Sequence, residues 1–287
     1  MKNYTKHIIS LLLFGSNGII ANNVNVSSYE IVFWRTMMGS LLLVSIFFLT
    51  SHKPTFMQHK KDTFYIVLSG ISMGASWMFL YEAFSQIGVS IATLIYYCGP
   101  VIVMVLSPIL FKENLGVEKV ISFVAVFIGI FLINGESSGQ SINKWGLYCG
   151  LMSALTYSLM VIFNKKSKKV IGLENSVIQL VVSFITVNVF MVFKTGFHFY
   201  ASGFDWLHLI VIGIINTGIG CYLYFSTIAY LPVQSVAILG YLEPLCAILL
   251  SFFLLGESMS LIQSLGAVLI IGGAAFGNFV KFSRQLK

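Results

Sequence analysis

The sequence predicts an all-α integral membrane protein of ten transmembrane helices, arranged as two inverted five-helix repeats. Three observations support this prediction: the composition, ten long apolar runs, and a match between the two halves of the chain. Of the 287 residues, 57% are hydrophobic and only 9% are charged, and the mean hydropathy is +0.89. A soluble domain carries about 25% charged residues, so the lipid bilayer is expected to surround most of this chain.

Each predicted helix is a continuous apolar run, because a bilayer core about 30 Å thick needs about 20 apolar residues per helix. The runs do not alternate between apolar and polar residues, which favours helices over the strands of a barrel. The connectors are too short to hold a soluble catalytic domain. The predicted spans are 7–21, 30–50, 63–84, 89–111, 118–134, 145–164, 174–193, 206–230, 233–255 and 261–280.

The first run also has features of a signal peptide, since Lys2 and Lys6 precede the apolar residues 8–14. No convincing small-x-small cleavage site follows, and removal of this run would break the repeat described below. We therefore expect it to remain as the first helix.

Positive charge is distributed unevenly between the two sides of the predicted bundle. With the N-terminus in the cytoplasm, 14 of the 17 Lys and Arg residues fall in cytoplasmic segments, while the outer loops hold only Lys144 and Lys194. Cytoplasmic loops retain Lys and Arg, so both termini are predicted to lie in the cytoplasm, with the protein in the cytoplasmic (inner) membrane. The net charge of +7 is therefore a topology signal, and no nucleic-acid partner is expected.

The densest basic run covers residues 164–169, with the sequence Asn-Lys-Lys-Ser-Lys-Lys. It is typical of a topology anchor at the midpoint of the chain, which is the reading that the sequence favours. A site for lipid headgroups or for a partner is the alternative.

The two halves of the chain match each other. Residues 89–130 align with residues 233–274 at a constant offset of 144. Each half, 1–137 and 138–287, then holds five helices, and an odd number places the second half upside down in the membrane. The matching pairs are Val89/Val233, Tyr97/Tyr241, Pro100/Pro244, Leu106/Leu250, Ser107/Ser251, Leu110/Leu254, Glu113/Glu257 and Gly129/Gly273.

Inverted repeats are the architecture of secondary transporters, whose substrate sites lie near the midplane between the halves. The leading hypothesis is therefore a transporter of a small metabolite, working by alternating access. No Walker motif is present, so protons, another coupling ion, the membrane potential or the substrate gradient would drive it, without a cofactor.

Two other classes of protein were weighed against a transporter. A membrane enzyme would need clustered catalytic or metal-ligating residues, whereas the five His are scattered near span ends and the four Cys show no metal-ligand spacing. An enzyme and a bound metal are therefore not expected. A non-transporting scaffold has no evident need for an inverted repeat. Gly273 and Gly277 have small-xxx-small spacing, which suits helix packing or a dimer face, so a monomer and a homodimer both stay open.

The repeat ends resemble the EamA family of the drug/metabolite transporter superfamily. The similarity rests on Pro100 with residues 110–114, Pro244 with residues 254–258, the Gly-rich helix after each, Arg35, and Gly15-Ser16-Asn17. The resemblance covers essentially the whole chain. It implies ten helices and transport of a small molecule, usually an amino acid or related metabolite. The chain departs from the commoner family pattern by carrying Lys112 rather than Gly before Glu113.

Glu243 is the clearest candidate site residue, because a charge near the bilayer centre costs roughly 2.5–3.5 kcal/mol. It directly precedes Pro244, which removes a backbone donor and leaves carbonyls free to face a cavity. Gly99-Pro100 occupies the equivalent place in the first half, so both helices are expected to break there. The carboxylate is predicted to bind an amine or cationic substrate or to take up a proton. The alternative is a protonated side chain that joins two helices by a hydrogen bond.

Arg35 and Glu82 are predicted to share the outer leaflet and to form a buried ion pair that gates the outer entrance. The alternatives are a static pair, or two side chains that snorkel to the interface.

Polar and aromatic side chains complete the candidate site. Asn17 is expected to break the first helix at a cavity wall, with hydrogen bonding between helices as the alternative. Aromatic faces attract organic cations, which raises the alternative of quaternary ammonium transport, although aromatic side chains also simply pack. The aromatic candidates are Tyr97, Tyr241, Trp77 and Tyr81.

Overall fold

The computed structural model describes residues 2–21, 23–50, 54–134, 143–194, 196, 200–255 and 260–285. Within these ranges the secondary structure is entirely helical, which confirms the all-α prediction. The helices are α1 (Lys2–Gly15), α2 (Asn17–Ala21), α3 (Ser28–Leu49), α4 (Lys60–Ile87), α5 (Val89–Tyr96), α6 (Cys98–Phe111), α7 (Val117–Asn134), α8 (Lys144–Lys166), α9 (Gly172–Lys194), α10 (Gly203–Ile210), the π-helix η1 (Val211–Ile219), α11 (Gly220–Ile228), α12 (Val233–Gly240), α13 (Leu242–Leu255) and α14 (Leu261–Gln285).

Seven helical stretches in the described part of the chain are long and apolar enough to cross a membrane, judged by length and composition. Four of them are the single helices α3, α4, α8 and α9. The other three run through a break or a change of helix type, and they join α5 to α6, α10 through η1 to α11, and α12 to α13. This is a multi-pass membrane protein.

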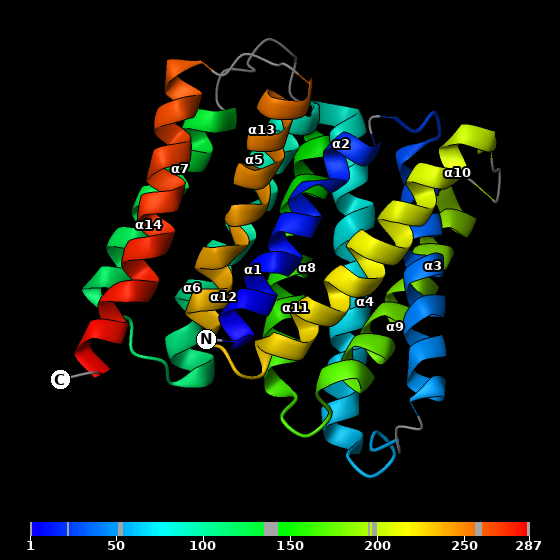
Figure 1. Ribbon diagram of the computed structural model, residues 1–287, viewed down its shortest axis with the longest axis horizontal. Helices are drawn as coiled ribbons and strands as arrows, with labels where there is room; N and C mark the ends of the chain where they lie inside the picture. The colour runs from blue at the N-terminus through cyan, green and yellow to red at the C-terminus, as the bar shows by residue number, and fades with distance from the viewer. Residues whose placement is uncertain are drawn as a thin grey trace.

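The helices stand side by side in one bundle (Figure 1). Both chain ends lie at the face drawn at the bottom, called here the lower face, and α2 lies at the opposite, upper face. Helices α7 and α14 pack together at one end of the bundle, while α3, α9 and α10 lie at the other end. Helix α1 runs through the middle, against α11 and α13.

Two helices are interrupted at the positions that their prolines determine. A proline cannot donate to the carbonyl four residues earlier, which is Tyr96 for Pro100 and Gly240 for Pro244. Helices α5 and α12 end at those two residues. The break residues that follow, Tyr97 and Tyr241, have nearly the same backbone angles, with φ −73° and ψ 0° against φ −74° and ψ −5°.

Gly99 does not cause the first break; it allows a close helix contact. A Cβ at this position would lie 2.7 Å from the Tyr157 ring and 2.9 Å from the Ala154 carbonyl oxygen. Ser158 on α8 also donates a hydrogen bond to the Gly99 carbonyl, at 2.9 Å. Gly99 therefore serves the packing of α6 against α8.

One glycine on α7 and one on α14 serve the packing of these two helices against each other. A Cβ on Gly273 would lie 2.9 Å from the Ser122 carbonyl oxygen of α7, and one on Gly129 of α7 would lie 2.6 Å from the Gly266 carbonyl oxygen of α14. Gly273, one member of the predicted small-xxx-small pair, thus faces α7. The orientation of Gly277 lies outside the described residues.

Lys112 closes α6 in a left-handed backbone conformation, with φ 55°. Glycine adopts this conformation at little cost, whereas other residues are strained by roughly 1–2 kcal/mol. The position is the one where the resembled family commonly carries Gly, and the geometry gives the reason.

Candidate functional site

A cavity of about 340 Å³ lies among α1, α2, α3, α4, α5, α8, α11 and α13. Its volume is within the range of about 300–1,000 Å³ that is usual for small-molecule sites. The walls are mostly apolar and aromatic, with a few polar groups. The predicted site residues on its wall are Asn17, Arg35, Trp77, Tyr81, Tyr97, Glu243 and Pro244.

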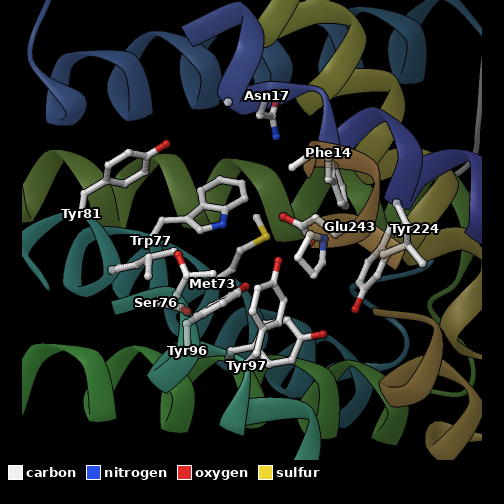
Figure 2. A pocket seen from close by; sticks show the side chains of 18 of the residues that line it. Phe14, Asn17, Met73, Ser76, Trp77, Tyr81, Tyr96, Tyr97, Tyr224 and Glu243 are labelled. Carbon is white, nitrogen blue, oxygen red and sulfur yellow. The ribbon is translucent and has the colours of Figure 1, made fainter. Parts of the chain in front are cut away.

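Glu243 brings a carboxylate into this cavity because it follows the break between α12 and α13. Figure 2 shows Glu243 and Tyr97 pointing into the same space, with Asn17 facing them across it. Among the described residues, no side chain or backbone group forms a hydrogen bond or a salt bridge with this carboxylate. Within the described ranges, Glu243 therefore does not form the helix-to-helix hydrogen bond that was the alternative interpretation.

Arg35 lines the same cavity with a guanidinium that is 5% exposed. Its Nε donates to Thr217 Oγ1 of η1 at 2.9 Å, and its Cζ lies 4.5 Å from the centre of the Trp77 ring. A cation over an indole face is attracted by the ring's quadrupole. Both interactions hold the guanidinium in place. Arg35 and Glu243 form no salt bridge, so the guanidinium nitrogens lie more than 4.0 Å from the carboxylate oxygens.

The predicted ion pair between Arg35 and Glu82 is wrong. The Glu82 carboxylate forms a salt bridge with Lys194 of α9 at 3.0 Å and accepts hydrogen bonds from Trp145 Nε1 at 3.0 Å and from the Tyr29 hydroxyl. Arg35 and Glu82 do not meet because they lie at different heights along the axis of α4. Arg35 reaches α4 at Trp77, and Glu82 lies five residues further on, about 7.5 Å along the helix axis. Glu82 is a cross-link at the upper face, outside the cavity.

Tyr241 is also placed differently from the prediction. Its side chain is fully buried, and its hydroxyl donates to the Tyr97 carbonyl at 2.8 Å. The two rings lie 5.8 Å apart. Tyr241 therefore supports the backbone at the break beside the cavity, while its repeat partner Tyr97 lines the wall. Gly99 and Pro100 do not line the cavity either.

Asn17 sits at the first residue of α2, directly after the turn at Ser16 that separates α1 from α2. Its side-chain oxygen accepts a hydrogen bond from Asn216 Nδ2 of η1 at 3.0 Å. Asn216 also donates to the Leu13 carbonyl at 2.8 Å. The cavity wall and the hydrogen bond between helices, which were alternatives at the sequence level, thus occur together.

One wall of the cavity was identified only in part from the sequence, through Trp77 and Tyr81. Residues of α4 spaced three and four apart form a stripe on one helix face, and this spacing is the signal that identifies them. Tyrosines from three other helices were read from the sequence mainly as packing residues. The stripe is Met73, Ser76, Trp77, Leu80, Tyr81 and Phe84, and the added tyrosines are Tyr96, Tyr157 and Tyr224.

The two ends of the cavity differ. Val89, at the start of α5 at the upper face, lines the cavity and is 62% exposed. At the lower face, all eight residues of α12 are buried. The Glu113 carboxylate accepts hydrogen bonds from the Val233 and Gln234 backbone N–H groups at 2.8 and 3.3 Å, which caps the start of α12.

Two lysines strengthen the same lower contact. Lys119 of α7 donates to Ser235 Oγ at 3.1 Å. Lys165 of α8 donates to the carbonyls of Ile228 and Ala229 at 3.0 and 3.2 Å, and to that of Leu231. The segment from α11 to α12 is therefore tied to α6, α7 and α8 at the lower face. Nowhere in the described ranges does a group of three His, Cys, Asp or Glu side chains suit a metal ion.

Comparison with known proteins identifies the family. The chain matches the EamA-like transporter family over residues 4–135 and 144–279. It is 29% identical over 273 residues to "Uncharacterized transporter YxxF" of Bacillus subtilis, covering 94% of this chain and 87% of the relative. It is 24% identical over 281 residues to "Uncharacterized inner membrane transporter YicL" of Salmonella typhimurium, covering 92% and 91%.

A solved structure shares the fold. It is titled "Crystal structure of protein", has a TM-score of 0.82 at 16% identity, and covers 98% of this chain and 99% of the other. The family match covers most of the chain and agrees with the resemblance found at the repeat ends. The chain therefore belongs to the EamA-like transporter family.

Proposed function

We propose that this protein is a secondary transporter that moves an amino acid or a related amine across the cytoplasmic membrane by alternating access. In this proposal α1 with α2, α7 and α14 join the seven long stretches to give ten crossings. Residues 1–137 and 138–287 form the two inverted repeats, and both termini lie in the cytoplasm. The protein is a carrier and not an enzyme.

The repeat is supported by the paired breaks. Tyr97 and Tyr241 occupy equivalent sequence positions and have nearly the same backbone angles. Helix α5 starts at the upper face, whereas α12 starts at the lower face (Figure 1), and this opposite direction supports the proposed inversion. Orientation is supported by the lysines, which are concentrated at the lower face.

The observation that carries the proposed substrate class is the pair of opposite charges on one cavity. Glu243 offers a carboxylate that is unpaired among the described residues, and Arg35 offers a guanidinium that is held there by a hydroxyl and an indole. An amino acid carries the two complementary charges. Its ammonium group would bind Glu243 and its carboxylate would bind Arg35, and charge-assisted hydrogen bonds of this kind are the strong ones.

The test is uptake into proteoliposomes of labelled amino acids, of the corresponding amines without the carboxylate, and of quaternary ammonium compounds, under imposed pH and potential gradients. Glu243→Gln is expected to lower uptake by about 30-fold or more, because losing one partner of a desolvated charge pair costs about 2–5 kcal/mol. Glu118→Gln, on α7 away from the cavity, is the control and keeps wild-type uptake. Wild-type uptake by Glu243→Gln overturns the proposal.

Arg35→Gln separates the substrate classes. It is expected to abolish uptake of the amino acid while leaving uptake of the matching amine within a few fold, because only the amino acid has a carboxylate for Arg35. Equal loss of both would remove the assigned role of Arg35 in selecting amino acids.

A second candidate substrate is an organic cation such as a quaternary ammonium compound. Trp77, Tyr81 and Tyr97 offer aromatic faces around the Glu243 carboxylate (Figure 2), and such faces bind quaternary ammonium groups. Arg35 has no favourable partner in that complex. Uptake of a quaternary ammonium compound in the same assay, with no uptake of amino acids, would select this candidate.

A further inference from the structure

A second pocket, of about 570 Å³, opens at the lower face, separate from the central cavity. Its wall comes from the start of α4, the end of α6 and the segment that joins α8 to α9. Six lysines line it together with a single carboxylate, that of Asp62. The lysines are Lys61, Lys112, Lys165, Lys166, Lys168 and Lys169.

The negative charge of Asp62 is already engaged. Its Oδ2 accepts hydrogen bonds from the backbone N–H groups of Lys168 and Lys169, at 2.7 and 2.6 Å. These two bonds order the loop so that consecutive lysines border one pocket. Between described residues, no carboxylate lies within salt-bridge distance of any of the six ammonium groups.

Two of the lysines have other partners. Lys165 is bound to the carbonyls at the end of α11, and the Lys166 ammonium lies 5.7 Å from the centre of the Tyr65 ring. Neither set of partners, the carbonyls or the tyrosine ring, carries a negative charge. The pocket therefore presents a concentrated positive charge that calls for an anionic ligand.

Lys112 is an independent observation that points the same way. It adopts a left-handed backbone conformation with φ 55°, where glycine would be free of strain. The side chain reaches the pocket wall and makes no hydrogen bond or salt bridge with another described residue. The backbone here favours glycine, so the lysine places a charge at the pocket at a cost in backbone strain.

Apolar side chains show which source of anion fits. Leu110 and Phe111 line the pocket beside the lysines, at the end of a membrane-spanning stretch. Ile109 next to them is 76% exposed, and Phe64 on α4 is 59% exposed. A soluble anion has no use for these residues, whereas acyl chains would cover them.

We propose that this pocket binds the phosphate of an anionic phospholipid headgroup, with the acyl chains lying over the exposed ends of α6 and α4. Lys112, Lys166, Lys168 and Lys169 contact the phosphate. This assignment is independent of the transported substrate. It converts the basic run at residues 164–169 from a topology anchor alone into part of a lipid site.

The experiment is native mass spectrometry of the full chain in neutral detergent, titrated with phosphatidylglycerol and with phosphatidylcholine. Phosphatidylglycerol is expected to bind at least tenfold more tightly. Lys168→Gln is expected to weaken it about fivefold, the effect of one basic residue at an anionic membrane surface. The matched control is Lys60→Gln, which removes a neighbouring charge outside the pocket and is expected to leave the affinity unchanged.

Lys112→Gly gives a second, opposite readout. It should raise the melting temperature of the lipid-free protein by about 2–4 °C, the change that about 1 kcal/mol produces, while weakening phosphatidylglycerol binding about fivefold. Loss of binding with a raised melting temperature cannot come from misfolding.

Three results would overturn the proposal. One is equal affinity for phosphatidylcholine, and another is equal weakening by Lys60→Gln, which would mean that only overall charge matters. The third is inorganic phosphate or glycerol 3-phosphate that competes as strongly as the lipid, which would assign the pocket to a soluble anion.

Discussion

Helices α5–α6 and α12–α13 are two versions of one element. Each breaks at a tyrosine three residues before a proline, with nearly the same angles, yet their starts differ. Val89 begins α5, lines the cavity and is 62% exposed, whereas its equivalent Val233 begins α12 and is fully buried. The shared motif sets the break, and the surroundings of the first turn decide which end of the cavity is open.

Hydrogen bonds with neighbouring segments hold the start of α12 in place. The start of α12 is capped by Glu113 and followed by Ser235, which accepts from Lys119. A transporter with alternating access needs such an asymmetry to reverse during its cycle. In the proposed alternating-access cycle, the exposed start of α5 and the buried start of α12 correspond to a state open at the upper face and closed at the lower face.

Gly99→Ala is expected to give the largest loss of stability, because it disturbs the first copy at its packing contact. A methyl group would lie 2.7 Å from the Tyr157 ring and 2.9 Å from a main-chain oxygen of α8, and overpacking of this kind costs about 1–3 kcal/mol. Thermal unfolding in detergent measures it. Gly272→Ala, where no atom lies within 4 Å of the added Cβ, is the control. Equal stability of the two variants would contradict the packing role.

Glu113→Gln should loosen the closed end. The substitution weakens the acceptor of two N–H groups at the start of α12. It also removes a negative charge that interacts favourably with the helix dipole. Together these changes should destabilise the start of α12 by about 1 kcal/mol. Labelling of a cysteine at Val233 by a maleimide should then rise about fivefold. The reaction is followed by mass, in a background where the four native cysteines are replaced by alanine. An unchanged rate would mean that Glu113 does not hold this end closed.

The smallest expected effect separates the two tyrosines at the breaks. Tyr241→Phe removes the hydroxyl that donates to the Tyr97 carbonyl and should lower stability by about 1 kcal/mol. Tyr97→Phe removes a hydroxyl from the cavity wall and should change substrate affinity with little change in stability. Thermal unfolding and binding titrations of both variants test the contrast, and the reverse pattern would contradict the placement of the two side chains.

The sequence predicts the helices well, because length and apolarity decide which segments enter a bilayer. Predicted span 63–84 lies within α4, and 145–164 lies within α8. The breaks in two helices also follow from sequence, since Pro100 and Pro244 remove specific hydrogen-bond donors. The left-handed backbone at Lys112 explains why glycine suits this position, whereas the lysine itself does not follow from the backbone.

Side-chain partners are harder to predict, because they depend on helix rotation and on depth. Lys194 was counted as a loop charge, and its position at the end of α9 brings it to Glu82 in place of Arg35. Tyr97 and Tyr241 are equivalent in sequence, but only the first faces the cavity. Asn17 and Glu243 were identified because polar groups inside apolar spans are costly.

The most direct test compares cysteines placed at Val89 and at Val233, one at a time, in membrane vesicles of known orientation. A membrane-impermeant maleimide is added from each side. The account predicts that the cysteine at position 89 reacts from the outer side and that the one at position 233 is protected from both sides. Equal reactivity of the two positions, or reaction of position 89 only from the cytoplasmic side, would contradict a cavity that is open outward and sealed at α12.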